Sequence, residues 1–182
     1  MILEVTESED FTRTIPTAGL ELAILYSIVD MGSQSTKFGD KRQVELTWEL
    51  PGQTHVFKEE EGPQTLVVSK RFTMSLNKKA GLFKAVKSML GVEPTNKFEI
   101  FDLLGNNSLL NLVHEVKGED TYCNIDSIIL NKSVEEIKQP ENPLVGFDLD
   151  NYDHGTYTAL PEWKQKVIAE SKEYKSLPDE GQ

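Results

Sequence analysis

The feature that most constrains the fold is a set of short segments in which apolar and polar residues alternate. In residues 43–50 (QVELTWEL) every second side chain is apolar, which is the period of a strand with one face on a core. The apolar phase consists of Val44, Leu46, Trp48 and Leu50. Residues 20–29 (LELAILYSIV) keep this period, but both phases are partly apolar. This pattern indicates a strand covered on both faces, as in a barrel.

Three further segments read as strands: residues 65–76, 108–115 and 121–130. The last two are close enough in sequence to predict a hairpin. Before them, apolar residues recur at helical spacing, with Asn77 as the predicted N-terminal cap and Gly91 as the residue that ends the helix.

The predicted order is three strands, one helix and two strands. It indicates a mainly β, α+β fold, a five-stranded OB-like barrel with the helix between strands 3 and 4. A β-sandwich with a packed helix is the alternative. We divide the chain into an N-terminal arm (1–18), the OB-like domain (19–131) and an acidic C-terminal tail (132–182). The tail is expected to hold a linker, a short helix from Pro161 and a disordered end.

Some regions lack the strand period. Residues 31–41 (MGSQSTKFGDK) are rich in turn residues, and a loop is predicted there. In the expected helix near the end of the chain, Trp163 and Val167 would share one face.

The charge of the chain is unevenly distributed. The formal net charge is −11, yet residues 62–92 contain no Asp or Glu. This basic stretch carries Lys70, Arg71, Lys78, Lys79, Lys84 and Lys87. A local excess of cations in an acidic protein is compatible with nucleic-acid binding, and also with a solvated lysine-bearing helix face.

Four segments of the sequence are informative together: residues 28–51, 67–91 (VVSKRFTMSLNKKAGLFKAVKSMLG), 101–130 and 142–174. They resemble a family of phage-encoded OB-fold single-stranded DNA-binding proteins from replication and recombination modules. The resemblance covers roughly residues 20–175. It implies action in the cytoplasm beside recombinases, helicases or polymerases, and it implies no catalytic residue. In this chain the tip of the last hairpin is acidic, where a lysine-rich tip would suit phosphate better.

Binding of a single strand without sequence preference needs cations along the phosphates and flat side chains on which bases stack. OB-folds present such groups on strands 2 and 3 and on the flanking loops. The candidates are Lys37, Phe38, Lys41, Arg42, Lys70, Arg71, Tyr122 and Trp48. The phase of Trp48 favours a place in the core over stacking, whereas Tyr122 would either stack on a base or cap the barrel end.

The C-terminal tail alternates acids with apolar groups around residue 150. Its candidate partner-binding residues are Phe147, Asp148, Asp150, Tyr152 and Asp153. Such a segment can dock on a basic, apolar pocket of a phage or host protein, or it can compete with DNA for the basic groove. A solvated linker is the alternative.

Enzyme motifs are absent from the sequence: it contains no GxxxxGK[ST], no GxGxxG and no GxSxG. Its three histidines and the single Cys123 have no metal-ligand spacing, so no cofactor or metal is expected. One cysteine and no secretory signal favour the bacterial host cytoplasm.

These observations predict a non-catalytic, sequence-nonspecific single-stranded DNA-binding protein of phage replication or recombination, as a monomer or a homo-oligomer. The alternative is an acidic adaptor or inhibitor that mimics DNA and binds a protein. The net charge of −11 motivates this second hypothesis.

Overall fold

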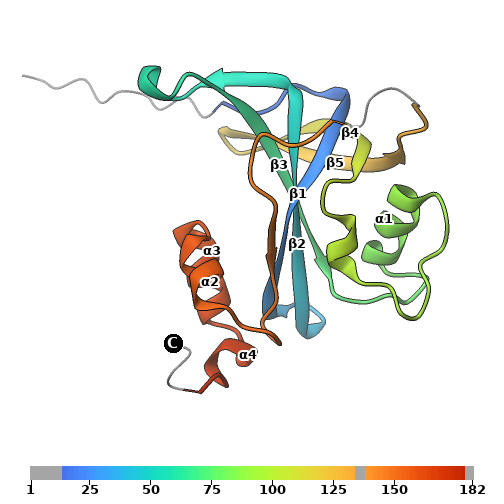
Figure 1. The fold of residues 1–182 in the computed structure, drawn as a ribbon, viewed down its shortest axis with the longest axis vertical. Helices are drawn as coiled ribbons and strands as arrows, with labels where there is room; N and C mark the ends of the chain where they lie inside the picture. Colours follow the sequence, from blue (N-terminus) through green and yellow to red (C-terminus); the bar gives the residue numbers. More distant parts are fainter. Residues whose placement is uncertain (1–13, 134–137, 179–182) are drawn as a thin grey trace, which may run out of the picture.

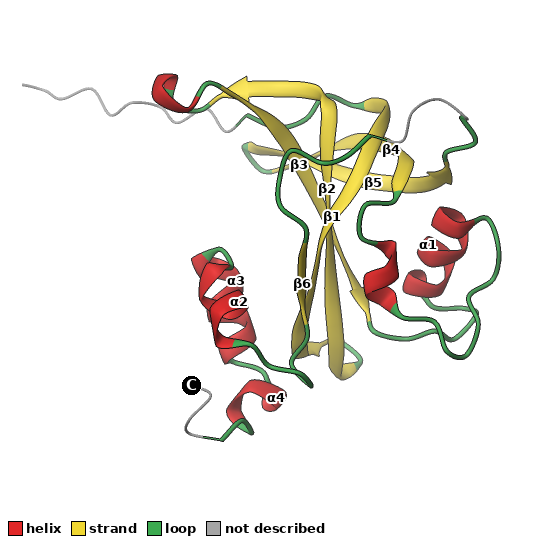
Figure 2. Cartoon of the chain, viewed as in Figure 1, coloured by secondary structure: helices red, strands yellow, loops and turns green. Residues whose placement is uncertain are grey.

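The computed structural model describes residues 14–133 and 138–178 and centres on one six-stranded sheet (Figures 1 and 2). The strand order is β3-β2-β1-β4-β5 with antiparallel neighbours, and β6 adds to β1 in parallel. The bounds are Gly19–Thr36 for β1, Gly39–Val56 for β2, Pro63–Thr73 for β3, Asn107–Lys117 for β4, Asp120–Leu130 for β5 and Val145–Phe147 for β6. The prediction of a mainly β, α+β chain is confirmed.

Strand β1 is the centre of the sheet and pairs with three strands, β2, β4 and β6. Its first residues, Gly19–Ile24, pair with β4, and Ser27–Val29 pair with β6. Its other edge pairs with β2 as far as Thr36. The predicted loop at residues 31–41 is wrong, because the β1–β2 hairpin continues to a turn at Lys37 and Phe38. Register shifts in β1 after Leu25 and after Asp30 interrupt the alternation that would have revealed the longer strand.

The first core lies between the sheet and helix α1, Gly81–Leu90. One stripe of the helix is buried: Leu82, Phe83, Ala85, Val86 and Met89. Gly91 follows the helix with a φ of 72°, as predicted for its end. The predicted cap is wrong, because the N-cap is Ala80, and the Asn77 side chain accepts a hydrogen bond from the Lys79 N–H in the turn before the helix.

The sheet does not close into a barrel. Within the described residues β3 and β5 form its two ends and do not pair with each other. The Lys70 ammonium crosses the seam between them and donates to the Ile125 carbonyl at 2.7 Å. The prediction of a five-stranded closed arrangement is therefore wrong in closure and strand number, although α1 does lie between β3 and β4.

A second core joins the C-terminal segment to β1. It contains Val29, Met31, Phe147, Leu149, Tyr157, Leu160 and Ile168. The segment forms β6 and the helices α2 (His154–Ala159), α3 (Glu162–Ala169) and α4 (Lys172–Lys175). Figure 1 shows α2 and α3 on the opposite side of the strands from α1. The expected acidic tail with one short helix is thus a folded part of the molecule.

Helix α3 begins one residue after Pro161, which is its N-cap. Trp163 and Val167 are four residues apart on α3 and share a face as predicted, but Trp163 is 49% exposed, and the buried residues of the helix are Lys164 and Ile168. Most of the expected disordered end (residues 179–182) lies outside the described residues.

Two short 3-10 helices complete the described chain. They are η1 (Glu59–Glu61), after β2, and η2 (Ile100–Leu103), before β4. Of the helices in the described ranges, none has the length and apolar character needed to cross a membrane.

Candidate nucleic-acid interface

The tip of the β1–β2 hairpin combines an exposed ring with two lysines. Phe38 is 76% exposed, and the Lys37 Nζ lies 5.0 Å from the centre of its ring. Lys41 is exposed three residues further along β2. The Thr36 hydroxyl donates to the Gly39 carbonyl at 2.6 Å and accepts from the Phe38 N–H at 3.1 Å. These bonds fix the turn, so the ring is presented on an ordered support.

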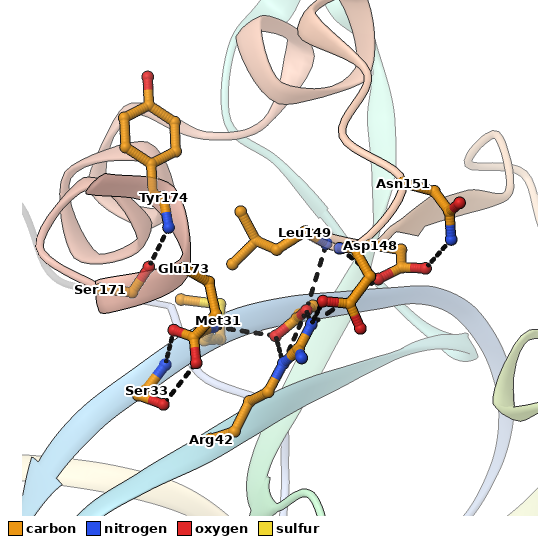
Figure 3. Close-up of polar contacts among 12 residues, drawn as sticks. Met31, Ser33, Arg42, Asp148, Leu149, Asn151, Ser171, Glu173 and Tyr174 are labelled. Atoms are coloured by element: carbon orange, nitrogen blue, oxygen red, sulfur yellow. Dashed lines mark hydrogen bonds and ion pairs between the residues drawn. The ribbon is translucent and has the colours of Figure 1, made fainter. Parts of the chain in front are cut away.

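Arg42 directly follows Lys41 in β2, and carboxylates surround its guanidinium (Figure 3). Its Nε donates to both oxygens of Asp30 at 3.3 and 3.2 Å, and its Nη2 lies 3.0 Å from Asp150 Oδ1 and 3.8 Å from Asp148 Oδ1. Hydrogen bonding, first to Asp30 and then to Asp150, raises the pKa of Arg42 despite its partial burial. Arg42 therefore balances acids of the fold.

Asp30 anchors this cluster from β1. It is 2% exposed and accepts additional hydrogen bonds from the N–H groups of Gly32 and Leu149. Leu149 belongs to the C-terminal segment, so one buried carboxylate links β1, β2 and that segment. These two N–H groups, together with Nε and Nη2 of Arg42, are four donors to a carboxylate that would otherwise be costly to bury.

The other two predicted cations of the strands lie on different faces of β3. Arg71 is on the outer face, where its Nη2 donates to Glu45 Oε2 at 3.2 Å. Lys70 occupies the opposite phase, at the seam, and lines a cavity with Phe72 and Lys84. The structure therefore does not bring Arg42, Lys70 and Arg71 onto one surface, and this part of the predicted site is wrong.

The rest of the basic stretch lies in and before α1. Lys78 and Lys87 both pair with Glu93, at 3.2 and 3.1 Å. The hydrogen bonds from these two lysines, Lys87 first, lower the pKa of Glu93. The stretch thus forms no single uninterrupted cationic face.

The two remaining predicted rings differ in access. Trp48 is fully buried in the first core, and its Nε1 has no hydrogen-bond partner among the described residues. Base stacking on Trp48 is excluded in this conformation. Tyr122 is half-buried near the β4–β5 turn, with the Lys117 Nζ 5.8 Å from its ring centre.

The predicted partner-binding residues are used within the fold. Phe147 is 1% exposed in the second core, where its ring packs against the Tyr152 and Tyr157 rings at 6.0 Å between centres. Asp153 caps α2 by accepting from the Thr156 N–H at 2.7 Å. Hydrogen bonds from Thr156 lower the pKa of Asp153. Contact with a partner through Phe147 would require the segment to leave β1.

Sequence reasoning missed a row of buried acids on the outer face of β2. Glu45 is 4% exposed and forms an ion pair with the buried Lys164 of α3, with 2.9 Å between Nζ and Oε1. Glu49 is 1% exposed and accepts from the N–H groups of Glu141 and Asn142 at 2.8 and 2.9 Å, and from the Asn142 amide at 2.6 Å. Both carboxylates attach the C-terminal segment to β2.

Asp30, Glu45 and Glu49 lie on strands and bind the C-terminal segment. A fourth carboxylate, Glu173, lies in α4 of that segment and binds β1. Glu173 accepts from the Ser33 N–H at 2.7 Å and from its hydroxyl at 2.6 Å (Figure 3). Burial works to raise the pKa of Glu173, but the hydrogen bonds from Ser33 outweigh it and lower the pKa. The sequence contained one signal that a second layer covers β1: both phases of residues 20–29 are partly apolar.

Among the described residues, no group of three or more His, Cys, Asp and Glu side chains is arranged to hold a metal ion. No protein-family model matches the chain, and no curated protein matches it.

Proposed function

We propose that this protein binds single-stranded DNA without sequence specificity, in phage replication or recombination, and that the β1–β2 tip makes the first contact. The observation that carries the proposal is the exposed Phe38 ring between Lys37 and Lys41. Stacking on such a ring tolerates every base, and the two ammonium groups suit the adjoining phosphates.

The order of the strands supports the same proposal. Three antiparallel strands, a helix and a further hairpin follow one another as in an OB-fold, whose first loop and strands 2 and 3 contact oligonucleotides. Here the C-terminal segment covers the outer face of β2 through Lys164 and Asn142. The tip and the outer face of β3 are therefore the parts of that surface left for a strand.

Replacement of the ring tests the proposal directly. Phe38→Ala should weaken binding of an oligonucleotide by about 1–3 kcal/mol, the contribution of one stacked base. The matched control is Phe57→Ala, since Phe57 is also exposed (55%) but follows the opposite end of β2. Equal effects of the two substitutions, measured by fluorescence anisotropy, would remove the tip from the interface.

The lysines are tested by salt dependence. The plot of log K against log salt has a negative slope, and its magnitude should decrease by about 1.4 in the Lys37→Gln/Lys41→Gln double variant, at roughly 0.7 per phosphate contact. Lys166→Gln serves as the control, because Lys166 is exposed on α3 and pairs with Glu162. An unchanged slope in the double variant would contradict phosphate contact at the tip.

A second candidate function is binding of a basic protein by an acidic surface. It is favoured by the pairing of Arg42, Arg71 and Lys164 with carboxylates of the fold, in a chain of net charge −11. In that case the native protein would shift no oligonucleotide at low salt and would bind a cationic polypeptide.

A further inference from the structure

A cavity of about 290 Å³ lies beside the proposed tip. Its walls are largely apolar and include the Phe98 and Phe101 side chains together with Val44 of β2. Its polar lining comes from Arg42, the Ser75 hydroxyl and the carboxylates Asp30, Glu99, Asp148 and Asp150. The cavity therefore joins an apolar, aromatic interior to a rim that is rich in hydrogen-bond acceptors.

The position of the cavity connects it to the tip. Arg42 and Gly39 are three residues apart on β2, which places the cavity roughly 10 Å from the turn at a rise of about 3.4 Å per residue. Lys41 lies between them in sequence and is exposed on the opposite phase of β2 from Arg42, so it can hold a phosphate outside the cavity. A strand stacked on Phe38 could therefore continue along β2 and reach the cavity within its next nucleotides.

The lining determines which part of a nucleotide suits the cavity. A phosphate would meet the carboxylates of Glu99, Asp148 and Asp150, so it is disfavoured by like charge. A base is neutral and flat, and its exocyclic amino group can donate to a carboxylate, as cytosine N4 donates to Asp or Glu. The volume lies at the lower limit of ligand pockets, which fits a single ring system.

We propose that, along a strand otherwise bound without sequence specificity, this cavity accepts one base and at that single position favours bases with an exocyclic amino group over thymine. The proposal rests on the proposed function. The base would lie against the Phe98 and Phe101 side chains, with its amino group toward Asp150, whose side chain is 67% exposed at the rim. The phosphates would remain outside, at Lys37 and Lys41.

The test compares oligo-dC with oligo-dT of equal length, titrated against the full-length protein. The native protein should bind oligo-dC about five-fold or more tightly, the lower end of the discrimination from one base contact. Asp150→Asn should narrow this ratio, because the amide is a weaker acceptor. The control Asp126→Asn changes an exposed acid on β5 and should leave the ratio unchanged.

A second variant fills the cavity without changing charge. Leu76 lines the cavity and is 42% exposed, so Leu76→Trp should abolish the ratio while the native circular dichroism is retained. Equal binding of both oligonucleotides by the native protein, or a ratio unaffected by both variants, would overturn the proposal. If no base preference is found but Phe38→Ala weakens binding of both oligo-dC and oligo-dT, the proposed function stands. If the native protein binds neither, the proposed function itself has failed.

Discussion

Glu45 is the residue at which the strands and the C-terminal segment depend on each other most directly. Its two oxygens face two cations, Arg71 from β3 and Lys164 from α3, and both Glu45 and Lys164 are buried. A buried ion pair gives little net stability by itself, but loss of Lys164 would leave the buried Glu45 carboxylate with only the partly exposed Arg71 as a counter-charge.

Lys164→Met should therefore lower the free energy of unfolding by about 3 kcal/mol, the low end for a broken buried pair. Urea denaturation followed by circular dichroism measures the change. Lys166→Met removes an exposed lysine from the same helix and should change the stability by no more than about 0.5 kcal/mol. Equal stability of the two variants would show that Lys164 is solvated.

The raised pKa of Tyr152 predicts that the protein loses stability at alkaline pH. Burial raises its pKa to about 12, with a further contribution from Tyr174. In the unfolded chain the phenol ionises near 10, so between pH 10 and 12 only the unfolded state releases this proton. Stability should fall as the pH rises through this window.

Tyrosinate absorbance of the native protein and of Tyr152→Phe measures this directly. The difference between the two titrations should show a phenol that ionises about two pH units above an ordinary tyrosine. A difference curve centred near pH 10 would contradict the packing of Tyr152 against Phe147 and Tyr174.

At the scale of elements, the contact between β1 and α4 is unusually close. Gly32 has a φ of 68°, and a Cβ at this position would collide with the side chain of Ser171. Gly118, in the β4–β5 turn, has a φ of 66° with nothing within 4 Å of such a Cβ. The two glycines therefore differ in packing but share the same backbone conformation.

Gly118→Ala should cost about 1–2 kcal/mol, which is the left-handed strain alone. Gly32→Ala should introduce the same strain and should also displace α4. Its decrease in the free energy of unfolding, measured by urea denaturation, should therefore be clearly larger than that of Gly118→Ala. Equal losses would indicate that α4 moves away from β1 without cost.

The elements recovered from the sequence are those in which local pattern and tertiary environment agree. The strand at residues 43–50, the hairpin at 108–130 and Gly91 belong to this group, as does the preference for Trp48 in the core. In the proposed site, Phe38 is exposed, as a ring that stacks on a base must be, while its role in binding remains a proposal.

The elements that were missed depend on contacts distant in sequence. Residues 31–36 are strand because β2 pairs with them across register shifts, and no local period records this. Glu45 and Glu49 look like the solvent side of an amphipathic strand, yet Lys164 and Asn142 cover them from more than 90 residues away. The ion pairs of Arg42 escaped prediction for the same reason.

For the whole molecule, two cores that share β1 should unfold together. The division at residue 131 would instead predict an independent OB-like domain and a dispensable tail. A chain ending at Asn131 would expose Val29 and Met31 and would leave Asp30, Glu45 and Glu49 without their C-terminal partners.

We therefore expect the truncated chain to lose cooperative unfolding, while the full chain shows one calorimetric transition. Differential scanning calorimetry and one-dimensional proton NMR of both chains measure this. A truncated chain that keeps dispersed resonances and a sharp transition would show that the first core is sufficient.

The central position of β1 also bears on how the protein emerges from a ribosome. Ser27–Val29 are synthesised early, but their parallel neighbour, Val145–Phe147, follows more than a hundred residues later. At about 5–20 residues per second, roughly 6–24 s pass before this neighbour of β1 is synthesised, and until then Asp30 also lacks its contact with Leu149. The native state therefore cannot be completed before Val145–Phe147 have been synthesised, and a stalled or prematurely terminated chain would present an open, aggregation-prone strand to chaperones.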